Sequence, residues 1–361
     1  MTTRRIQAVA TAAATVVASL TALPAAHALA PVHTSRQIVR AGQSIQSAID
    51  RARPGDVILV RPGTYAGSLR ITVPRLTIRG AGERTVITPS RTSTENVCAA
   101  AGHGICVAGT ALHNVRGVQL RSLTVAGFRK NGIDASYADR LTVAGVTVRN
   151  NGEQGISQER SLRGVFRGNV ARDNGQAGIF VANVVNTEAG ALDTQGTLVT
   201  GNRLTGNRFG VVLRRVRDTT VEANTVTGNC GGVFVVGDEN VPRAGELTIS
   251  RNQVVANNKY CASNGRLPFI QGTGILLTGT ENTLVTRNRV QGNTGTSPMS
   301  GGIVLYRSNV GVHNTGNSVR NNVATGNGPA DLADRDAGTG NTFTGNTCGV
   351  VAPAAAERCS R

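Results

Sequence analysis

The sequence contains no tryptophan, and aromatic residues make up only 3% of its 361 positions. This scarcity argues against a broad aromatic platform for sugar rings, although it is compatible with a polar binding surface. No Lys/Arg run is interleaved with aromatic residues, so the pattern expected of a nucleic-acid-binding surface is missing. P-loop, G-x-S-x-G and dinucleotide-binding glycine motifs are also absent. We therefore expect no nucleic-acid partner and no chemistry of these motif-defined classes.

Long apolar runs are lacking except at the N-terminus. Arg4 and Arg5 precede an alanine-rich apolar run, and small residues then offer A-x-A cleavage sites after Ala28 or Ala30. This pattern is typical of a secretory signal peptide, which we assign to residues 1–30. The Ala/Thr-rich run is weakly apolar, which favours a cleaved signal over a membrane anchor. We expect an exported, extracellular chain with no membrane association after cleavage.

A phrase close to Asn-x-Val-x-x-Asn, followed by Gly-Ile or Gly-Val, recurs from about residue 132 to residue 346. Without an insertion it returns every 22 or 23 residues, and such a period indicates a repeat architecture. The first asparagine stands at Asn169, Asn202, Asn224, Asn252, Asn288, Asn322 and Asn341, the second at Asn151, Asn174, Asn207, Asn229, Asn257, Asn293, Asn327 and Asn346, and the glycine at Gly132, Gly155, Gly178, Gly210, Gly232, Gly274 and Gly302.

Each repeat carries three short runs rich in Val, Ile and Thr, separated by Gly/Asn turns, and these predict strands. Three strands per repeat predict the coil of a parallel β-helix, since a single coil cannot bury its inner side chains without stacked neighbours. We therefore expect an all-β fold: a single right-handed parallel β-helix of about ten coils. The corner asparagines are expected to adopt left-handed backbone conformations and to bond between coils.

A short helix is predicted before the repeats, within residues 42–56. Ile45, Ala48 and Ile49 share one apolar face of this helix, and Pro-Gly ends it. Because an open solenoid end exposes core and strand edges, this helix is expected to cap it. The domain boundaries that follow are a linker and cap helix over 31–56, the β-helix over 57–346, and a disulfide-stapled tail over 347–361.

The cap segment also resembles a known family. Ser44-Ile45-Gln46-Ser47-Ala48-Ile49, Pro54-Gly55-Asp56-Val57-Ile58 and Pro62-Gly63-Thr64-Tyr65 look like the amino-terminal cap of the pectate-lyase-like right-handed parallel β-helix superfamily. The later Gly-Ile phrases resemble its β-helix repeats, and the segment from Asn341 to Cys359 resembles the closing coil of secreted actinobacterial members. The resemblance implies right-handedness, export and a carbohydrate-active superfamily that contains lyases, hydrolases and epimerases.

Cysteine is sparse, and its six copies lack the C-x-x-C spacing of a zinc site. In an exported chain, they predict disulfides. Sequence proximity suggests the first and third pairs, and the repeat register places the second pair at one corner of adjacent coils. We expect the pairs Cys98 with Cys106, Cys230 with Cys261, and Cys348 with Cys359.

The chain has few acidic residues relative to basic ones, giving a formal net charge of +17, or +15 after loss of Arg4 and Arg5. One interpretation is affinity for a polyanion such as an acidic polysaccharide. The other is an arginine-rich composition spread over an exposed solenoid. We expect a monomeric protein with a polysaccharide partner.

Four insertions interrupt the period, and loops of this kind often wall a binding face. They cover residues 184–196, 237–246, 258–273 and 294–301. In the strand after each glycine, period-2 alternation predicts an outward stripe that is apolar in five coils. We expect the insertions to cover this stripe, formed by Phe180, Val212, Phe234, Leu276 and Val304.

The two preceding coils carry polar residues at the outward positions. Asp134 and Glu159 are expected roughly 8 Å apart on one face, given the strand spacings, and this suits a paired-carboxylate site with a basic neighbour. The alternative is a solvated polar face with local ion pairs. The expected catalytic residues are Asp134, Glu159, Lys130 and Arg160, and the expected substrate-binding residues are Arg140, Tyr137 and Arg214.

Stronger catalytic signatures of the superfamily are absent. Gly132-Ile133-Asp134 is not followed by Pro-His, and no Asp-Asp pair or Trp-Ile-Asp-His motif follows a glycine. His103 and His113 lack ligand spacing and are interpreted as solvated loop residues. No certain cofactor is predicted. Calcium is considered at Asp134 and Glu159, and at the segment Asp331, Asp334 and Asp336, where Gly338 replaces a needed oxygen ligand.

Two functions remain open. The first is a secreted polysaccharide lyase or glycoside hydrolase, or an epimerase-type enzyme, that acts on an extracellular acidic polysaccharide. The alternative is a non-catalytic extracellular protein that binds glycans or cell surfaces. The polar cluster and the positive charge favour the first function, whereas the missing signatures favour the second.

Overall fold

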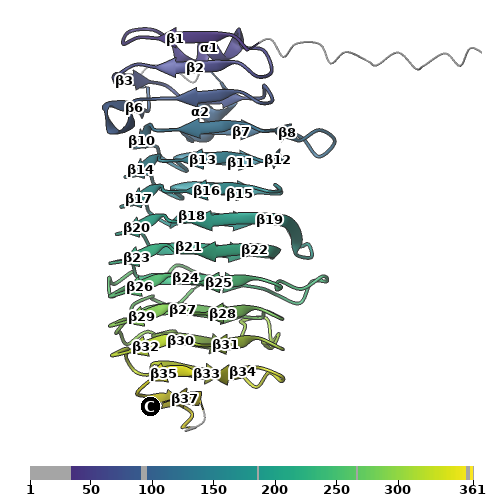
Figure 1. The fold of residues 1–361 in the computed structure, drawn as a ribbon, viewed down its shortest axis with the longest axis vertical. Helices are drawn as coiled ribbons and strands as arrows, with labels where there is room; N and C mark the ends of the chain where they lie inside the picture. The colour runs from purple at the N-terminus through teal and green to yellow at the C-terminus, as the bar shows by residue number, and fades with distance from the viewer. Residues whose placement is uncertain (1–33, 91–95, 185–186, 266, 355–357, 361) are drawn as a thin grey trace, which may run out of the picture. The chain divides into compact units, whose positions relative to one another are not determined.

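The computed structural model describes residues 34–90, 96–184, 187–265, 267–354 and 358–360. The predicted signal peptide lies outside these residues. Within them, every described strand pair is parallel, and three sheets run along a stack of coils (Figure 1). No helix in this part of the chain is long and apolar enough to cross a membrane.

Sheets A and B hold twelve strands each and sheet C holds eleven, so the stack is slightly longer than the ten coils expected. Sheet A contains β1 (Arg36–Val39), β2 (Val57–Val60), β5 (Thr77–Arg79), β9 (Gln119–Arg121), β13 (Thr142–Ala144), β16 (Val165–Arg167), β19 (Leu192–Thr200), β22 (Val216–Glu222), β25 (Thr248–Ser250), β28 (Leu284–Thr286), β31 (Ser318–Arg320) and β34 (Thr342–Thr344). Sheet B contains β3 (Gly63–Ala66), β6 (Thr85–Thr88), β10 (Thr124–Ala126), β14 (Thr147–Arg149), β17 (Val170–Arg172), β20 (Arg203–Thr205), β23 (Thr225–Thr227), β26 (Gln253–Val255), β29 (Arg289–Gln291), β32 (Val323–Thr325), β35 (Asn346–Cys348) and β37 (Cys359–Ser360).

Sheet C carries the face on which the candidate site was predicted. It contains β4 (Leu69–Ile71), β7 (Ile105–Ala108), β11 (Ile133–Ser136), β15 (Ile156–Glu159), β18 (Ala177–Ala182), β21 (Phe209–Arg214), β24 (Gly231–Val236), β27 (Thr273–Thr278), β30 (Gly301–Tyr306), β33 (Leu332–Arg335) and β36 (Val351–Ala352). Two short strands, β8 (Val115–Arg116) and β12 (Ala138–Asp139), pair with each other at a corner. The sheets enclose one continuous core of Val, Ile and Leu side chains, because successive coils bury the same inward positions.

The predicted cap helix is present but shorter than its pattern suggested. Helix α1 (Ile45–Asp50) begins after Ser44, whose hydroxyl accepts the backbone N–H of Ser47 at 3.1 Å. Its apolar face is buried and packs against β1, β2 and β4. Strand β1 lies in the segment expected to be a linker and pairs with β2 as the first strand of sheet A. A strand and a helix together therefore close this end.

The described residues contain two other short helical segments, the 3-10 helix η1 (Gly82–Arg84) and helix α2 (Val97–Ala101). The predicted tail continues the coils, because β35, β36 and β37 pair into sheets B and C. All three expected disulfides are present: Cys98–Cys106, Cys230–Cys261 and Cys348–Cys359.

Buried asparagine side chains form ladders between coils, as expected. The Nδ2 atom of Asn202 donates to Asn224 Oδ1 at 2.8 Å and to the Phe166 carbonyl at 2.9 Å. The backbone N–H of Asn202 donates to the same Oδ1 atom at 2.9 Å. The second ladder ends where Asn327 donates to Asp331 at 2.9 Å. Each ladder residue thus satisfies buried polar groups in the coils on both sides.

The expected left-handed conformation of these asparagines is wrong. The positive φ belongs to the preceding residue, as at Gly201 (63°), Ala223 (53°) and Arg251 (55°). The turn is made one position earlier because the asparagine must align its backbone N–H with the next coil's amide oxygen.

Candidate functional site

The outer face of sheet C changes from polar to apolar along one column of paired positions. Asp134 of β11 pairs with Ser157 of β15, and Ser157 pairs with Phe180 of β18. The column continues through Val212, Phe234, Leu276 and Val304. The predicted register is confirmed. The phenylalanines lie outside the core, in a second apolar cluster on this face.

The insertions cover much of this second cluster, as expected. Ile270 and Met299, from the third and fourth insertions, are buried in it, and Leu267 packs against it. The Cys230–Cys261 disulfide ties the third insertion to the corner before β24. The first insertion is not a loop throughout, because its last residues join β19 and pair with β22.

A cavity of about 530 Å³ lies over the apolar column. Phe180, Phe209, Val212, Phe234 and Leu276 contribute its apolar lining from sheet C, together with Leu267 and Met299 from the insertions. Polar residues also line it, namely Gln154, Gln176, Glu188, Arg214, Arg215, Asp238, Glu239, Thr278, Arg307, Ser308 and Asn309. Each of the five stripe residues is at most 9% exposed, as expected of a covered stripe, and a binding-sized cavity remains between the stripe and its cover.

Asp134 and Glu159 come together beside this cavity, two strand positions apart on adjacent strands. Burial raises the pKa of Glu159, and the charge of Asp134 raises it further, while Arg160 and Arg214 act in the opposite direction. Glu159 is thus poised to hold a proton nearer neutral pH than an exposed glutamate does, as a general acid requires.

Of the predicted arginines, Arg160 and Arg214 act on Glu159, whereas Arg140 acts on Asp139 instead. Arg160 donates to the Tyr137 hydroxyl at 2.7 Å and lies over its ring, with 5.5 Å from the guanidinium carbon to the ring centroid. Arg214, at the end of β21, lines the cavity and acts electrostatically on Glu159. Arg140 is exposed after β12, where it helps to lower the pKa of Asp139. The structure does not bring it into this cluster.

His103, interpreted from the sequence as a solvated loop residue, lies beside the carboxylates in the structure. The backbone N–H of Asn131 donates to His103 Nδ1 at 3.2 Å, and the Asn131 side chain donates to Asp134 at 2.8 Å. Burial lowers the pKa of His103; Asp134 and Glu153 oppose this effect, and Lys130 adds to it. The sequence signal for this position is the Gly104-Ile105 pair, which matches the later Gly-Ile phrases and puts His103 in register with Asn131 and Gln154.

The aspartates considered for calcium have separate protein partners. Asp331 accepts from Asn327 and from the backbone N–H groups of Gly349 and Val350. Asp334 pairs with Arg358, and Asp336 contacts His313. Among the described residues, no three His, Cys, Asp or Glu side chains are grouped to hold a metal ion.

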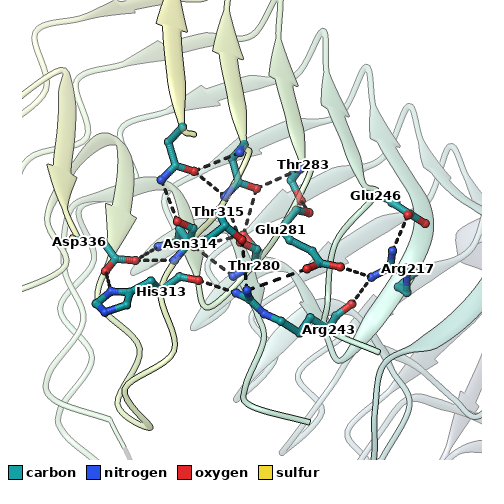
Figure 2. A network of polar contacts seen from close by, with 12 residues as sticks. Arg217, Arg243, Glu246, Thr280, Glu281, Thr283, His313, Asn314, Thr315 and Asp336 are labelled. Carbon is teal, nitrogen blue, oxygen red and sulfur yellow. Dashed lines mark hydrogen bonds and ion pairs between the residues drawn. The ribbon is translucent and has the colours of Figure 1, made fainter. Parts of the chain in front are cut away.

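A second polar network lies at the corner where the chain passes from sheet C to sheet A (Figure 2). Arg217 donates to Glu281 at 2.7 Å, and Arg243 donates to Thr315 at 3.1 Å. Asp336 accepts from the Asn314 side chain at 2.7 Å; although burial alone would raise its pKa, hydrogen bonds from Asn314 and His313 lower it. These contacts tie neighbouring coils together, which indicates a structural role.

Comparison with known proteins defines the family. The family model described as the right handed beta helix region matches residues 64–191 and 186–297. These matches cover more than half of the chain, so the protein belongs to this family. The expected right-handed, pectate-lyase-like architecture is thereby confirmed. A comparison with curated proteins finds no match.

Two solved structures with similar folds are enzymes by their names. The A-module of the mannuronan C-5 epimerase AlgE6 from Azotobacter vinelandii is 16% identical, with a TM-score of 0.56, over 84% of this chain and 88% of that one. DFA-IIIase from Arthrobacter chlorophenolicus A6 is 15% identical, with a TM-score of 0.60, over 85% of this chain and 77% of that one. At these identities the likeness shows the fold alone.

Proposed function

We propose that this chain is an exported, monomeric carbohydrate-active enzyme that acts on an acidic polysaccharide at the outer face of sheet C. The carrying observation is that Asp134 and Glu159 lie two strand positions apart on adjacent strands, with Arg160 and Arg214 acting on Glu159 beside a cavity. The named activities of the structural neighbours, on mannuronan in one case, support a carbohydrate substrate.

In hydrolysis, Glu159 would give its proton to the glycosidic oxygen while Asp134 takes a proton from water. The water oxygen attacks the anomeric carbon, and the carbon–oxygen bond to the leaving sugar breaks. The strand register allows roughly 8 Å between the two residues, within the separation that leaves room for this water.

In β-elimination, Asp134 would take the proton from the carbon beside the sugar carboxylate, and the bond to the leaving oxygen would break as a carbon–carbon double bond forms. Glu159 would protonate the leaving oxygen. Arg160, Arg214 and Lys130 would hold the sugar carboxylate and offset the charge that develops on it. If ionised Asp134 and Glu159 held calcium instead, the ion would offset the same charge, and water would supply the proton for the leaving oxygen.

The test is a panel of pectin, alginate, hyaluronan and chondroitin, assayed for unsaturated product and for new reducing ends, with and without calcium. We expect turnover of at least one polymer, and Asp134→Ala and Glu159→Ala should each lower it about 100-fold or more. Glu83→Ala, at an exposed carboxylate in η1, is the matched control and should retain turnover.

Different outcomes separate the two functions left open by the sequence. Turnover that survives both substitutions would remove the proposed site but leave an enzyme. No turnover on any polymer, together with retained binding on a glycan array, would instead identify a non-catalytic glycan-binding protein.

A further inference from the structure

The cavity beside the acidic cluster has an apolar floor that the reaction chemistry does not use. The two regions share one column, because Asp134 and Ser157 are followed directly by Phe180, Val212 and Phe234. Phe209 and Phe234 contact each other, with ring centroids 4.6 Å apart. The apolar surface therefore begins one coil from Glu159 and two coils from Asp134, at about 4.8 Å per coil along the stack.

This floor suits an aliphatic or aryl group better than another sugar ring. Each sugar hydroxyl placed against Phe180, Val212, Phe234 or Leu276 would lose water without gaining a hydrogen-bond partner from those side chains. The lining residue Arg215 does not supply such a partner, because its buried guanidinium already bonds to Glu188, Asp238 and the Thr187 carbonyl.

The polar end of the cavity favours a negatively charged head group. Arg214 lies in the column that contains Glu159, separated from it by Ala182, and it lines the cavity itself. Gln154 and Gln176 line the cavity at the starts of the strands, across from Arg214 at the strand end. The lining carboxylates Glu188 and Asp238 pair with Arg215, and Arg214 is the lining cation that shares a column with Glu159 next to the apolar floor.

We propose that the substrate is an amphiphilic acidic glycoside, whose sugar lies at the Asp134–Glu159 cluster and whose alkyl or aryl substituent fills the cavity. This inference rests on the proposed function and narrows its substrate class. The cavity of about 530 Å³ falls within the size range of small-molecule sites.

Calorimetric titration of the full chain with alkyl glucuronides, from methyl to octyl and below their micelle concentrations, tests this proposal. We expect Kd to fall about fourfold for each added methylene until the cavity is full. Octyl glucoside, which lacks the carboxylate, should bind more weakly than octyl glucuronide, and Arg214→Gln should remove that difference.

A cavity-filling substitution supplies the structural control. Val236→Trp, at a half-buried position in the lining, should abolish the chain-length dependence. Val323→Trp places the same bulk at a 41% exposed position in sheet B and should leave the dependence intact. Circular dichroism and thermal melting of both variants verify folding.

Three results would overturn the inference: one Kd for every chain length, dependence that survives Val236→Trp, or octanoate binding as tightly as octyl glucuronide. The last result would mean that the sugar contributes nothing. If any of these occurs while Glu159→Ala still abolishes polysaccharide turnover, the inference fails and the proposed function stands.

Discussion

Glu159, the proposed proton donor, carries an energetic cost when it is charged. Its side chain projects from the outer face of sheet C next to Asp134, and burial is the largest cause of its raised pKa. A carboxyl whose folded pKa is raised contributes stability that is present below its unfolded pKa. That contribution is lost as the pH rises through the folded pKa, because the buried site then disfavours the charge.

Glu159→Gln should therefore separate stability from activity. We expect a higher melting temperature than the parent at pH 7 and little difference near pH 4, where both side chains are neutral. Turnover should fall about 100-fold or more, because glutamine cannot donate the proton. Melting curves across this pH range give the measurement, and a lower melting temperature at pH 7 would contradict the assignment of a costly buried charge.

The positions of His103 and Arg140 on the coil differ from those expected from the sequence. His103 looked like a loop histidine, yet Asn131 links it to Asp134 through two hydrogen bonds. Arg140 is only six positions from Asp134, yet it acts on Asp139 at another corner of the coil. Proximity in the chain does not predict proximity on a coil, because each corner turns the backbone to a new sheet.

At the level of elements, the asparagine ladders hold successive coils in register. Asn224 lies in the middle of one ladder: it donates to Asn252 and to the Val199 carbonyl and accepts two bonds from Asn202. All these groups are buried between strands, where an unsatisfied backbone N–H is costly.

Asn224→Ala should destabilise the protein strongly, by roughly 2–4 kcal/mol, since it leaves buried donors and acceptors without partners. Gln253→Ala, at an exposed position on the neighbouring β26, is the control and should change stability by less than about 0.5 kcal/mol. Denaturant unfolding measures both, and equal effects would show that the ladder contributes no special stability.

For the molecule as a whole, stability depends on closing the exposed end of the stack. The described N-terminal end is closed by β1 and by α1, whose Ile49 is 2% exposed. Without that cover, apolar core and strand edges would be accessible to other copies of the chain.

Ile49→Asp should therefore cause association as well as destabilisation, because a charge on the buried face of α1 displaces the helix from the core. Ser47→Asp puts the same charge on the exposed face and should remain monomeric. Size-exclusion chromatography with light scattering distinguishes the outcomes. A monomeric Ile49→Asp variant of unchanged melting temperature would show that α1 is dispensable as a cap.

The sequence by itself determined the coil, since a fixed period of short β-branched runs has one way to bury its inner side chains. It also determined the disulfides, through sequence proximity for two pairs and register for Cys230–Cys261, and the outward stripe, which depends on register alone. Only the tertiary structure decided how far the insertions cover that stripe and where a cavity remains. It also decided which charged groups meet, because loops lack a repeating pattern and their positions depend on packing between distant coils.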